Sequence, residues 1–390
     1  MSNCFSRILF IAKRECRRLI ANPVYVLGMV VFPILVTVLF TSLMDEGQPE
    51  EMPVGVVDLD NTSFTRKLTR SLDAFQTTHI VARYPNVEEA RKAMQQGTIY
   101  AFLYYPKETT DALLSSRQPT ISFYYSYTSL TAGSLLFRDL KTISTLGSAA
   151  VGSATLKAKG LTDAQIGTFL QPIKIDLHTV ANPWVNYNVY LSTMLVPGCL
   201  LLFVFLITAY AFGMELKQNT SRQLIKIAGG KGWVAIAGKA LPHLLVHLAI
   251  FSLYLFYIYK VLHFPHEGGV GVIALLAVLS VMGSMGFAIF MFGLFPQLRM
   301  SMSMCSLWGV LSYSMVGTAF PTFAMDAPLE VLSNLFPLRH YFRIYQTCVF
   351  NGNALIYDWA NILALVVFAL LPLLVARSIR KAYSTYVYLP

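Results

Sequence analysis

Residues 24–44 read VYVLGMVVFPILVTVLFTSLM, a run of 21 residues without a charged side chain. A helix of this length rises roughly 31 Å at 1.5 Å per residue, which is enough to cross the hydrocarbon core of a bilayer. Pro33 is expected to kink this helix. Arginines and a lysine precede the run and four acidic residues follow it within residues 45–51, so we predict that its N-terminal end faces the cytoplasm.

Five further apolar runs follow, at residues 189–213, 241–261, 270–295, 300–320 and 359–375. The segments between them alternate in charge. Residues 214–240 hold five Lys/Arg and one acidic residue, Glu215, whereas residues 262–269 hold no Lys or Arg. Lys and Arg accumulate in cytoplasmic loops. The fold class that we predict is an α-helical integral membrane protein with six transmembrane helices, an inserted α/β extracytoplasmic domain and both termini in the cytoplasm.

The composition agrees with this class: 55% of the residues are hydrophobic and 13% are charged, against about 25% in ordinary soluble proteins. The net charge is +10, but residues 45–184 hold 13 Lys/Arg and 14 Asp/Glu, so the basic surplus lies beside the membrane. The positive-inside rule accounts for that surplus, and no nucleic-acid partner is expected. There is no CxxC pair, no metal-ligand spacing and no cysteine in residues 45–184, so neither a metal site nor a disulfide framework is predicted.

Residues 45–184 differ from the rest and read as a water-exposed α/β domain. Short strands are predicted at 54–57, 79–83, 98–104 and 120–125, and they alternate with helices at 64–74, 87–96 and 107–114, a pattern typical of βαβ units. Residues 129–170 are rich in Ala, Ser, Gly and Leu and are predicted to form long helices.

The remaining segments complete the predicted organisation. Residues 1–22 are predicted to form an interfacial amphipathic helix, whose apolar face holds Phe5, Ile8, Leu9, Ala12, Cys16, Leu19 and Ile20. A charged flank that only sets topology is the alternative. Residues 23–44 are the first span, 45–184 the outer domain, 185–376 a five-helix membrane domain with a cytoplasmic loop at 214–240 and a re-entrant outer segment at 321–357, and 377–390 a cytoplasmic tail.

The outer-domain segment 52–129 resembles the extracytoplasmic domain of bacterial type-2 ABC exporter permeases, in which a strand ends in V-D-x-D-x-S and a later segment holds a Gly and a Pro. The matching residues here are Asp58, Asp60, Asn61, Ser63, Gly97 and Pro106. Two neighbouring aspartates raise the alternative of a metal site or an acid/base pair. Capping of the following helix is the interpretation that we favour.

The segment 215–242 is similar to that family's cytoplasmic loop, which forms a coupling helix that docks on the ATPase subunit. Its candidate coupling residues are Glu215, Lys217, Thr220, Gln223, Leu224, Gly238 and Lys239. Asn219 replaces the usual Gly, and Arg222 replaces the usual acidic residue. A basic solvated loop without a docking role is the alternative.

The segment 316–342 looks like the family's S-G-x-x-F-P…M-P…P-x-x-Y segment, which forms short re-entrant helices near the outer leaflet. The matching residues are Gly317, Phe320, Pro321, Met325, Pro328, Pro337 and Tyr341. The resemblance implies an external gate over the translocation path, and an ordinary outer loop broken by prolines is the alternative.

No GxxxxGK[ST] motif occurs, so the chain is not expected to bind ATP or to be an enzyme. The resemblance implies a permease in a bacterial inner (plasma) membrane that exports an amphipathic or hydrophobic substrate. ATP and Mg would then be used by partner ATPase subunits. It also implies a second permease copy, identical or a close paralogue, with a periplasmic adaptor and an outer-membrane channel as further partners.

Two rival functions remain open. The outer domain suits a membrane-anchored sensor or assembly protein, although six spans exceed what an anchor needs. A secondary carrier normally has carboxylates at mid-membrane depth, and the predicted spans have none there. His243 and His247 lie one helical turn apart, which suits helix packing or a proton relay.

Overall fold

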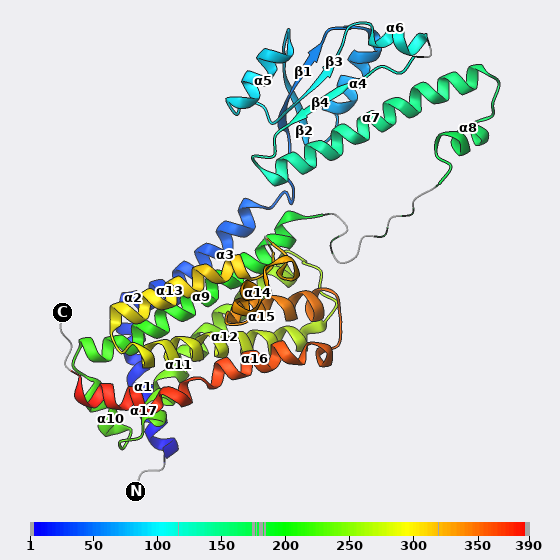
Figure 1. Cartoon of the computed structure of the whole chain (residues 1–390). Coiled ribbons are helices and arrows are strands. Elements are labelled where there is room, and N and C mark those ends of the chain that lie inside the picture. The colour runs from blue at the N-terminus through cyan, green and yellow to red at the C-terminus, as the bar shows by residue number, and fades with distance from the viewer. Residues whose placement is uncertain are drawn as a thin grey trace. The chain divides into compact units, whose positions relative to one another are not determined.

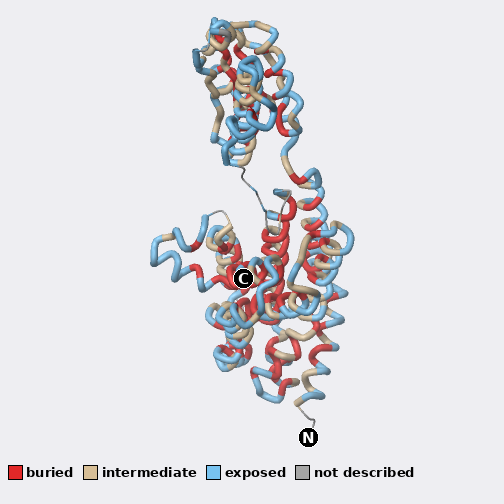
Figure 2. Tube along the Cα trace, turned by 90° about the vertical axis from the view of Figure 1, so that its right-hand side faces the viewer, coloured by how far each residue is buried: buried red, intermediate tan, exposed pale blue. Residues whose placement is uncertain are grey.

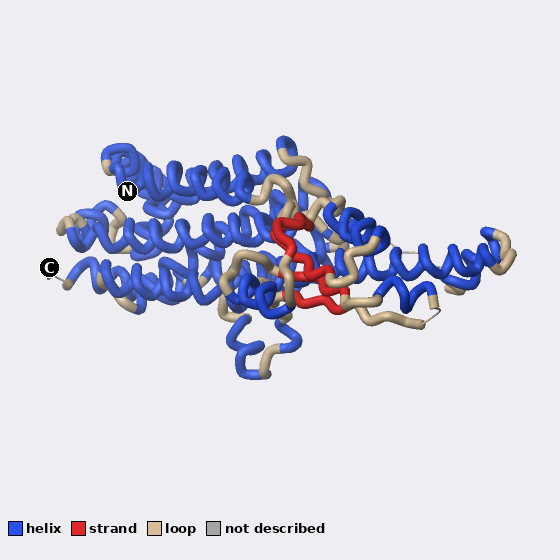
Figure 3. Tube along the Cα trace, turned by 90° about the horizontal axis from the view of Figure 1, so that it is seen from above, coloured by secondary structure: helices blue, strands red, loops and turns tan. Residues whose placement is uncertain are grey.

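The computed structural model describes residues 4–115, 117–173, 176, 178, 182, 185–318 and 320–386 (Figure 1). The chain divides into two compact units. The helical unit comprises Met1–Asp45 and Thr179–Pro390, and the α/β unit comprises Glu46–His178. All described strands belong to the α/β unit (Figure 3).

The helical unit begins with α1 (Cys4–Ala21) and a first span built from α2 (Pro23–Val26), a π-helical segment η1 (Leu27–Val31) and α3 (Phe32–Leu43). The π-helical segment ends two residues before Pro33, which lacks the N–H that a regular α-helix would use there. Within α3, Thr37 Oγ1 donates to the Pro33 carbonyl at 2.8 Å and Thr41 Oγ1 to the Thr37 carbonyl at 2.7 Å. These hydroxyls therefore need no partner in the bilayer.

Three long helices follow: α9 (Tyr187–Lys217), α11 (Gly232–Phe256, continued by η2 at Tyr257–Val261) and α12 (Gly269–Leu294). A short helix, α10 (Ser221–Ile227), joins α9 to α11. The windows of α9 and α12 that could cross the membrane are about two-thirds buried, whereas those of the first and last spans are mostly exposed. Figure 2 shows the buried residues running along the inner helices of this unit.

The unit ends with α13 (Leu298–Met315), η3 (Thr322–Ala324), α14 (Ala327–Ser333), α15 (Pro337–Ile344), η4 (Tyr345–Phe350), η5 (Leu355–Asp358), α16 (Trp359–Leu370) and α17 (Pro372–Thr385). Among the described residues, five helices are long and apolar enough to cross a membrane: Pro23–Leu43, Tyr187–Lys217, Gly232–Val261, Gly269–Leu294 and Leu355–Thr385.

The helix α13 occupies the place of the fifth predicted apolar run but is not among these five. It ends at Met315 rather than at residue 320, and serines alternate with its apolar residues. Ser301 Oγ donates to the Gln297 carbonyl, and Ser312 Oγ donates to the Gly309 carbonyl. Both hydroxyls are therefore hydrogen-bonded, and both side chains can be buried. The helix packs along α9. The multi-pass helical class is confirmed, and the count of six spans stays a prediction.

The face that the amphipathic helix α1 packs against the protein overlaps only in part with its predicted apolar face, at Ala12 and Leu19. Its buried residues are Ile11, Ala12, Glu15 and Leu19, and it packs against α11. The apolar residues Phe5, Leu9 and Ile20 are exposed. The packed side of α1 includes an acidic residue, Glu15, and a pattern of apolar residues cannot reveal a buried acidic side chain.

The α/β unit contains a four-stranded sheet in the order β2-β1-β3-β4. The strands are β1 (Met52–Asp58), β2 (Thr78–Arg83), β3 (Ala101–Tyr105) and β4 (Ser122–Tyr125). Strand β1 is parallel to β2 and β3, and β4 is antiparallel to β3. Each of the four predicted strands is present, as are the alternating helices α4 (Ser63–Asp73), α5 (Val87–Gln95) and α6 (Thr109–Leu114).

The two faces of this sheet carry different helices. Val54 and Val56 of β1 share a buried cluster with α4 and with the long helix α7 (Leu130–Ala158), whereas Val57 shares one with α5. This follows from the alternation of side chains along a strand. A short helix, α8 (Asp163–Leu170), contacts α7 and ends the regular part of the unit.

Candidate functional site

The segment between α9 and α11 is shorter than the loop predicted at 214–240. The helix α9 continues to Lys217 and α11 already begins at Gly232, so only residues 218–231 connect them. Glu215 therefore lies in the last turn of α9, and Gly238 and Lys239 lie within α11. The sequence prediction left both residues outside the helices because they are charged. In the structure their opposite charges form a buried ion pair.

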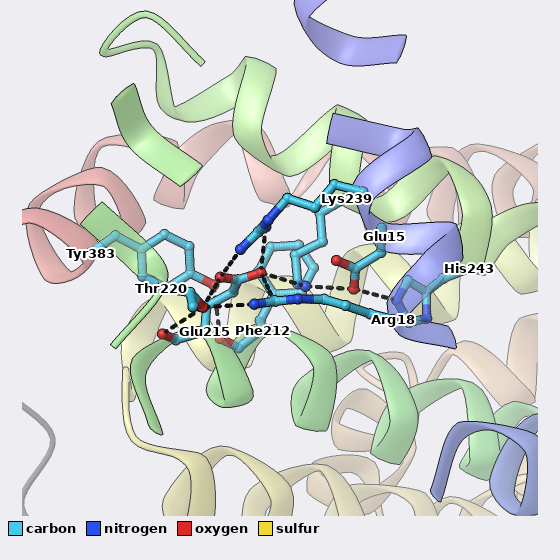
Figure 4. A network of polar contacts seen from close by, with 9 residues as sticks. Glu15, Arg18, Phe212, Glu215, Thr220, Lys239, His243 and Tyr383 are labelled. Carbon is cyan, nitrogen blue, oxygen red and sulfur yellow. Dashed lines mark hydrogen bonds and ion pairs between the residues drawn. The ribbon is translucent and has the colours of Figure 1, made fainter. Parts of the chain in front are cut away.

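The fully buried carboxylate of Glu215 accepts hydrogen bonds from three elements of the chain (Figure 4). Arg14 of α1 donates to both of its oxygens, at 2.9 and 3.1 Å, and Arg18 donates a further ion-paired hydrogen bond. Lys239 Nζ of α11 lies 3.1 Å from Oε1. Thr220, just before α10, donates to Oε2 at 2.6 Å. One side chain thus ties α1, α11 and the start of α10 to the end of α9.

The second buried carboxylate is Glu15 of α1. Its Oε1 accepts a hydrogen bond from Lys239 Nζ at 2.5 Å and lies 3.1 Å from His243 Nε2. Lys239 therefore bridges Glu15 and Glu215, and all three side chains are 0% exposed. We call Arg14, Glu15, Arg18, Glu215, Thr220, Lys239 and His243 the ion-pair cluster.

The electrostatics of the cluster favour two ionised carboxylates. Burial alone would raise the pKa of Glu15, but the charges and hydrogen bonds of Lys239 and His243 outweigh it and lower that pKa to about 2. The two carboxylates face the side chains of Lys239, Arg14 and Arg18, of which the two arginines are about one-fifth exposed at the edge of the cluster. A buried ion pair of this kind is costly to break because the remaining partner loses its compensation.

Gly238 allows α1 to approach α11 closely enough for these bonds. A Cβ atom at Gly238 would lie 2.8 Å from Ile11 Cβ and 3.0 Å from the Ile8 carbonyl oxygen of α1. A side chain there would push α1 away from Lys239. The role of Gly238 in the structure is therefore close helix packing next to the cluster.

The short helix α10 has an inner and an outer face. Leu224 is fully buried, and Ser221 Oγ donates to the Tyr383 carbonyl of α17 at 3.1 Å. Arg222, Gln223 and Lys226 are exposed, as is Lys217 before the helix. The seven predicted coupling residues therefore divide into a buried set and an exposed set. The buried or half-buried members are Glu215, Thr220, Leu224, Gly238 and Lys239, and the exposed members are Lys217 and Gln223.

The outer-domain motif forms a loop and cap in the α/β unit. Asp58 Oδ1 accepts from the amide of Asn61 at 2.8 Å, and Asp58 Oδ2 accepts from Thr65 Oγ1 of α4 at 2.8 Å. Asp60 Oδ2 accepts from Thr110 of α6, whose hydroxyl lies at 2.6 Å. Both carboxylates thus hold local structure, Asp58 in the loop before α4 and Asp60 at the start of α6, but neither supplies the N-cap of the following helix α4.

The other motif residues of the α/β unit are dispersed. Thr62, not Ser63, caps α4, and Ser63 is exposed in its first turn. Gly97 ends the α5 segment at a positive φ of 75°, and the Pro106 carbonyl accepts from Thr109 Oγ1 at 2.6 Å. In the described chain no group of three or more His, Cys, Asp and Glu residues could hold a metal ion.

The predicted outer gate residues lie in two environments. Gly317, with a φ of 99°, turns the chain after α13, and Phe320, Pro321 and Pro328 are exposed, with Met325 half-buried. Pro337 and Tyr341 belong to α15, which is buried against α12, α13 and α16. Tyr341 packs edge-on against Phe251 of α11. The structure therefore does not bring the seven residues into one site.

Comparison with protein families decides what kind of protein carries this architecture. The family described as ABC-2 family transporter protein matches the chain over residues 24–377. The chain belongs to the ABC-2 transporter family. A search of the curated proteins finds no significant match to it.

The most informative residues of this ABC-2 chain escaped sequence reasoning. The apolar face predicted for residues 1–22 does not include Arg14, Glu15 or Arg18, yet these residues meet Glu215 and Lys239 from positions about 200 residues away in the chain. One feature of the sequence could have pointed to these residues: Glu15 is the only acidic residue among the first 44. In this ABC-2 permease, hydrogen bonds and ion pairs to Glu215 connect α1, α9, α11 and the start of α10 at one end of the helical unit.

Proposed function

We propose that this ABC-2 protein is the permease half of an ATP-driven exporter and that the exposed face of α10 docks on a separate ATPase subunit. Membership of the family implies a transmembrane subunit with an ABC ATPase partner. The proposal extends this to export of an amphipathic or hydrophobic substrate by a pair of such permeases in a bacterial inner membrane.

The observation that carries the proposal is the ion-pair cluster directly behind α10. Thr220 begins α10 and bonds to Glu215, and Glu215 is bonded in turn to α1 and α11. A force on the exposed side of α10 would therefore move three membrane-associated helices together. Transport driven by an external motor requires such a rigid connection between the docking surface and the spans.

The arrangement of the termini supports six spans with cytoplasmic ends. The chain enters at α1, which bonds to the end of α9, and leaves at α17, which bonds to α10. The helices α1 and α17 therefore both lie at one end of the helical unit (Figure 1). An even number of crossings is required for this, so we propose α13 as the sixth span. The α/β unit would then lie outside the cytoplasm, where an adaptor and an outer-membrane channel are proposed partners.

The ion-pair cluster also bears on the rival carrier function. Within the ion-pair cluster, Glu15 is held ionised, and Glu15 and Glu215 both bond to Lys239. A proton-coupled carrier needs a carboxylate that changes protonation during the cycle. The cluster therefore supports a structural coupling role.

Co-purification of the chain with its ABC ATPase partner tests the proposal. Glu215 and Thr220 are poor test positions because changing them disturbs the interior. Arg222→Glu combined with Lys226→Glu reverses two exposed charges on α10 and is expected to weaken the association about tenfold. Lys260→Glu reverses an exposed charge at the far end of α11 and should leave association intact. Unchanged association of the α10 variant would refute the docking assignment.

A further inference from the structure

An apolar groove of about 330 Å³ lies on the helical unit between α11, α12 and the last span. Its walls include Trp233 of α11, Met285 and Ile289 of α12, and Leu370 and Leu373 at the junction of α16 and α17. Among the described residues, none of the ion-pair cluster lines it. Trp233, Leu370 and Leu373 are 45%, 53% and 64% exposed, so the groove opens to the surroundings of the helices.

One end of the groove is basic. Leu373 lines the groove, and Arg377 follows one turn later on the same face of α17. Arg380 Nη1 lies 3.4 Å from the Gly230 carbonyl oxygen, at the start of α11. Lys231 stands two residues before Trp233. Lys231, Arg377 and Arg380 thus belong to the two segments at this end of the groove, and Lys231 Nζ lies 3.6 Å from Cys4 Sγ of α1.

No acidic residue offsets these charges along the elements that build the groove. Residues 218–260, 269–299 and 359–386 contain neither Asp nor Glu. Glu15 and Glu215, which bond to Lys239 of α11, are buried within the ion-pair cluster. The end of the groove is therefore complementary to an anion.

We propose that the groove binds an anionic phospholipid, with an acyl chain along its apolar walls and the headgroup phosphate at Lys231, Arg377 and Arg380. Basic pockets between membrane helices recognise anionic headgroups. Arginine matches phosphate geometry with paired donors, and tryptophan favours the headgroup level of a bilayer. A lipid in this position joins the start of α11, the helix that carries Lys239, to α17.

Tryptophan quenching by brominated lipids tests this site. The full-length protein is reconstituted into phosphatidylcholine vesicles doped with either brominated phosphatidylglycerol or brominated phosphatidylcholine, and the Trp233 signal is the difference between the wild type and Trp233→Phe. Brominated phosphatidylglycerol should quench Trp233 at a several-fold lower mole fraction than brominated phosphatidylcholine does. Equal quenching by the two lipids, or no quenching of Trp233, would overturn the proposal.

Two pairs of variants separate the headgroup from the chain. Arg377→Gln with Arg380→Gln should abolish the preference, whereas Arg299→Gln, at an exposed position outside the groove, should retain it. Ala237→Phe, which fills the groove, should reduce quenching by both lipids, and Leu245→Phe on the exposed side of α11 should not. Arg377→Lys with Arg380→Lys checks that the helices still fold, because it keeps the charges. A preference that survives loss of both arginines contradicts the assigned headgroup site.

Discussion

Lys239 is the residue on which the coupling account depends most, because it lies between two buried carboxylates. Lys239→Met is expected to lower the free energy of unfolding by about 3–5 kcal/mol, since it leaves both carboxylates short of a partner. Thermal unfolding of the detergent-purified protein measures this. Lys260→Met, at an exposed position, is the matched control. Adding Glu15→Gln to Lys239→Met should recover part of the loss, and a double variant as unstable as the sum of the single variants would argue against a direct pair.

Glu15 gives the cluster a defined pH response. Its pKa is lowered from 4.5 to about 2, so the stabilisation from its ionised form is complete above about 4.5 and is lost as the pH falls toward 2. The melting-temperature difference between the wild type and Glu15→Gln should therefore be the same at pH 7.5 and pH 5.5. A difference that disappears between these two values would mean that Glu15 titrates with a raised pKa.

At the scale of elements, the contact between α1 and α11 depends on the absence of a side chain at Gly238. Gly238→Ala should separate the two helices, because its Cβ would lie 2.8 Å from Ile11 Cβ. A destabilisation of about 1–3 kcal/mol is typical of such overpacking. Hydrogen exchange measured by mass spectrometry should then be faster across residues 4–21. Gly271→Ala, where nothing lies within 4 Å of the added Cβ, should leave α1 unchanged.

An element was predicted well where the residues that define it are neighbours in the sequence. Strand β1 and helix α4 were predicted within one or two residues, because an apolar strand and a polar cap stand side by side in the sequence. The ends of α9 and α11 were predicted too short, because Glu215 and Lys239 looked like solvent-exposed charges. Their partner Glu15 is 224 residues from Lys239, and no local pattern reveals a contact at that separation.

At the scale of the whole molecule, the topology has its own test. The account places the α/β unit outside the cytoplasm, so a cysteine at the exposed Asp73 of α4 should react with a membrane-impermeant maleimide in intact spheroplasts, in a background without the native cysteines. A cysteine at Arg222 of α10 is the control for the other side and should react only after lysis. Labelling of the Asp73 position only after lysis would reverse the proposed topology.

The central claim is that this ABC-2 chain moves its substrate only when a separate ATPase drives it. Uptake of a panel of amphipathic dyes into inside-out vesicles containing the chain, with and without its ABC ATPase partner, tests that claim most directly. The account predicts ATP-dependent accumulation only when both proteins are present, and its loss in the Arg222→Glu, Lys226→Glu variant. Equal accumulation by the chain alone, driven by a proton gradient without nucleotide, would contradict it.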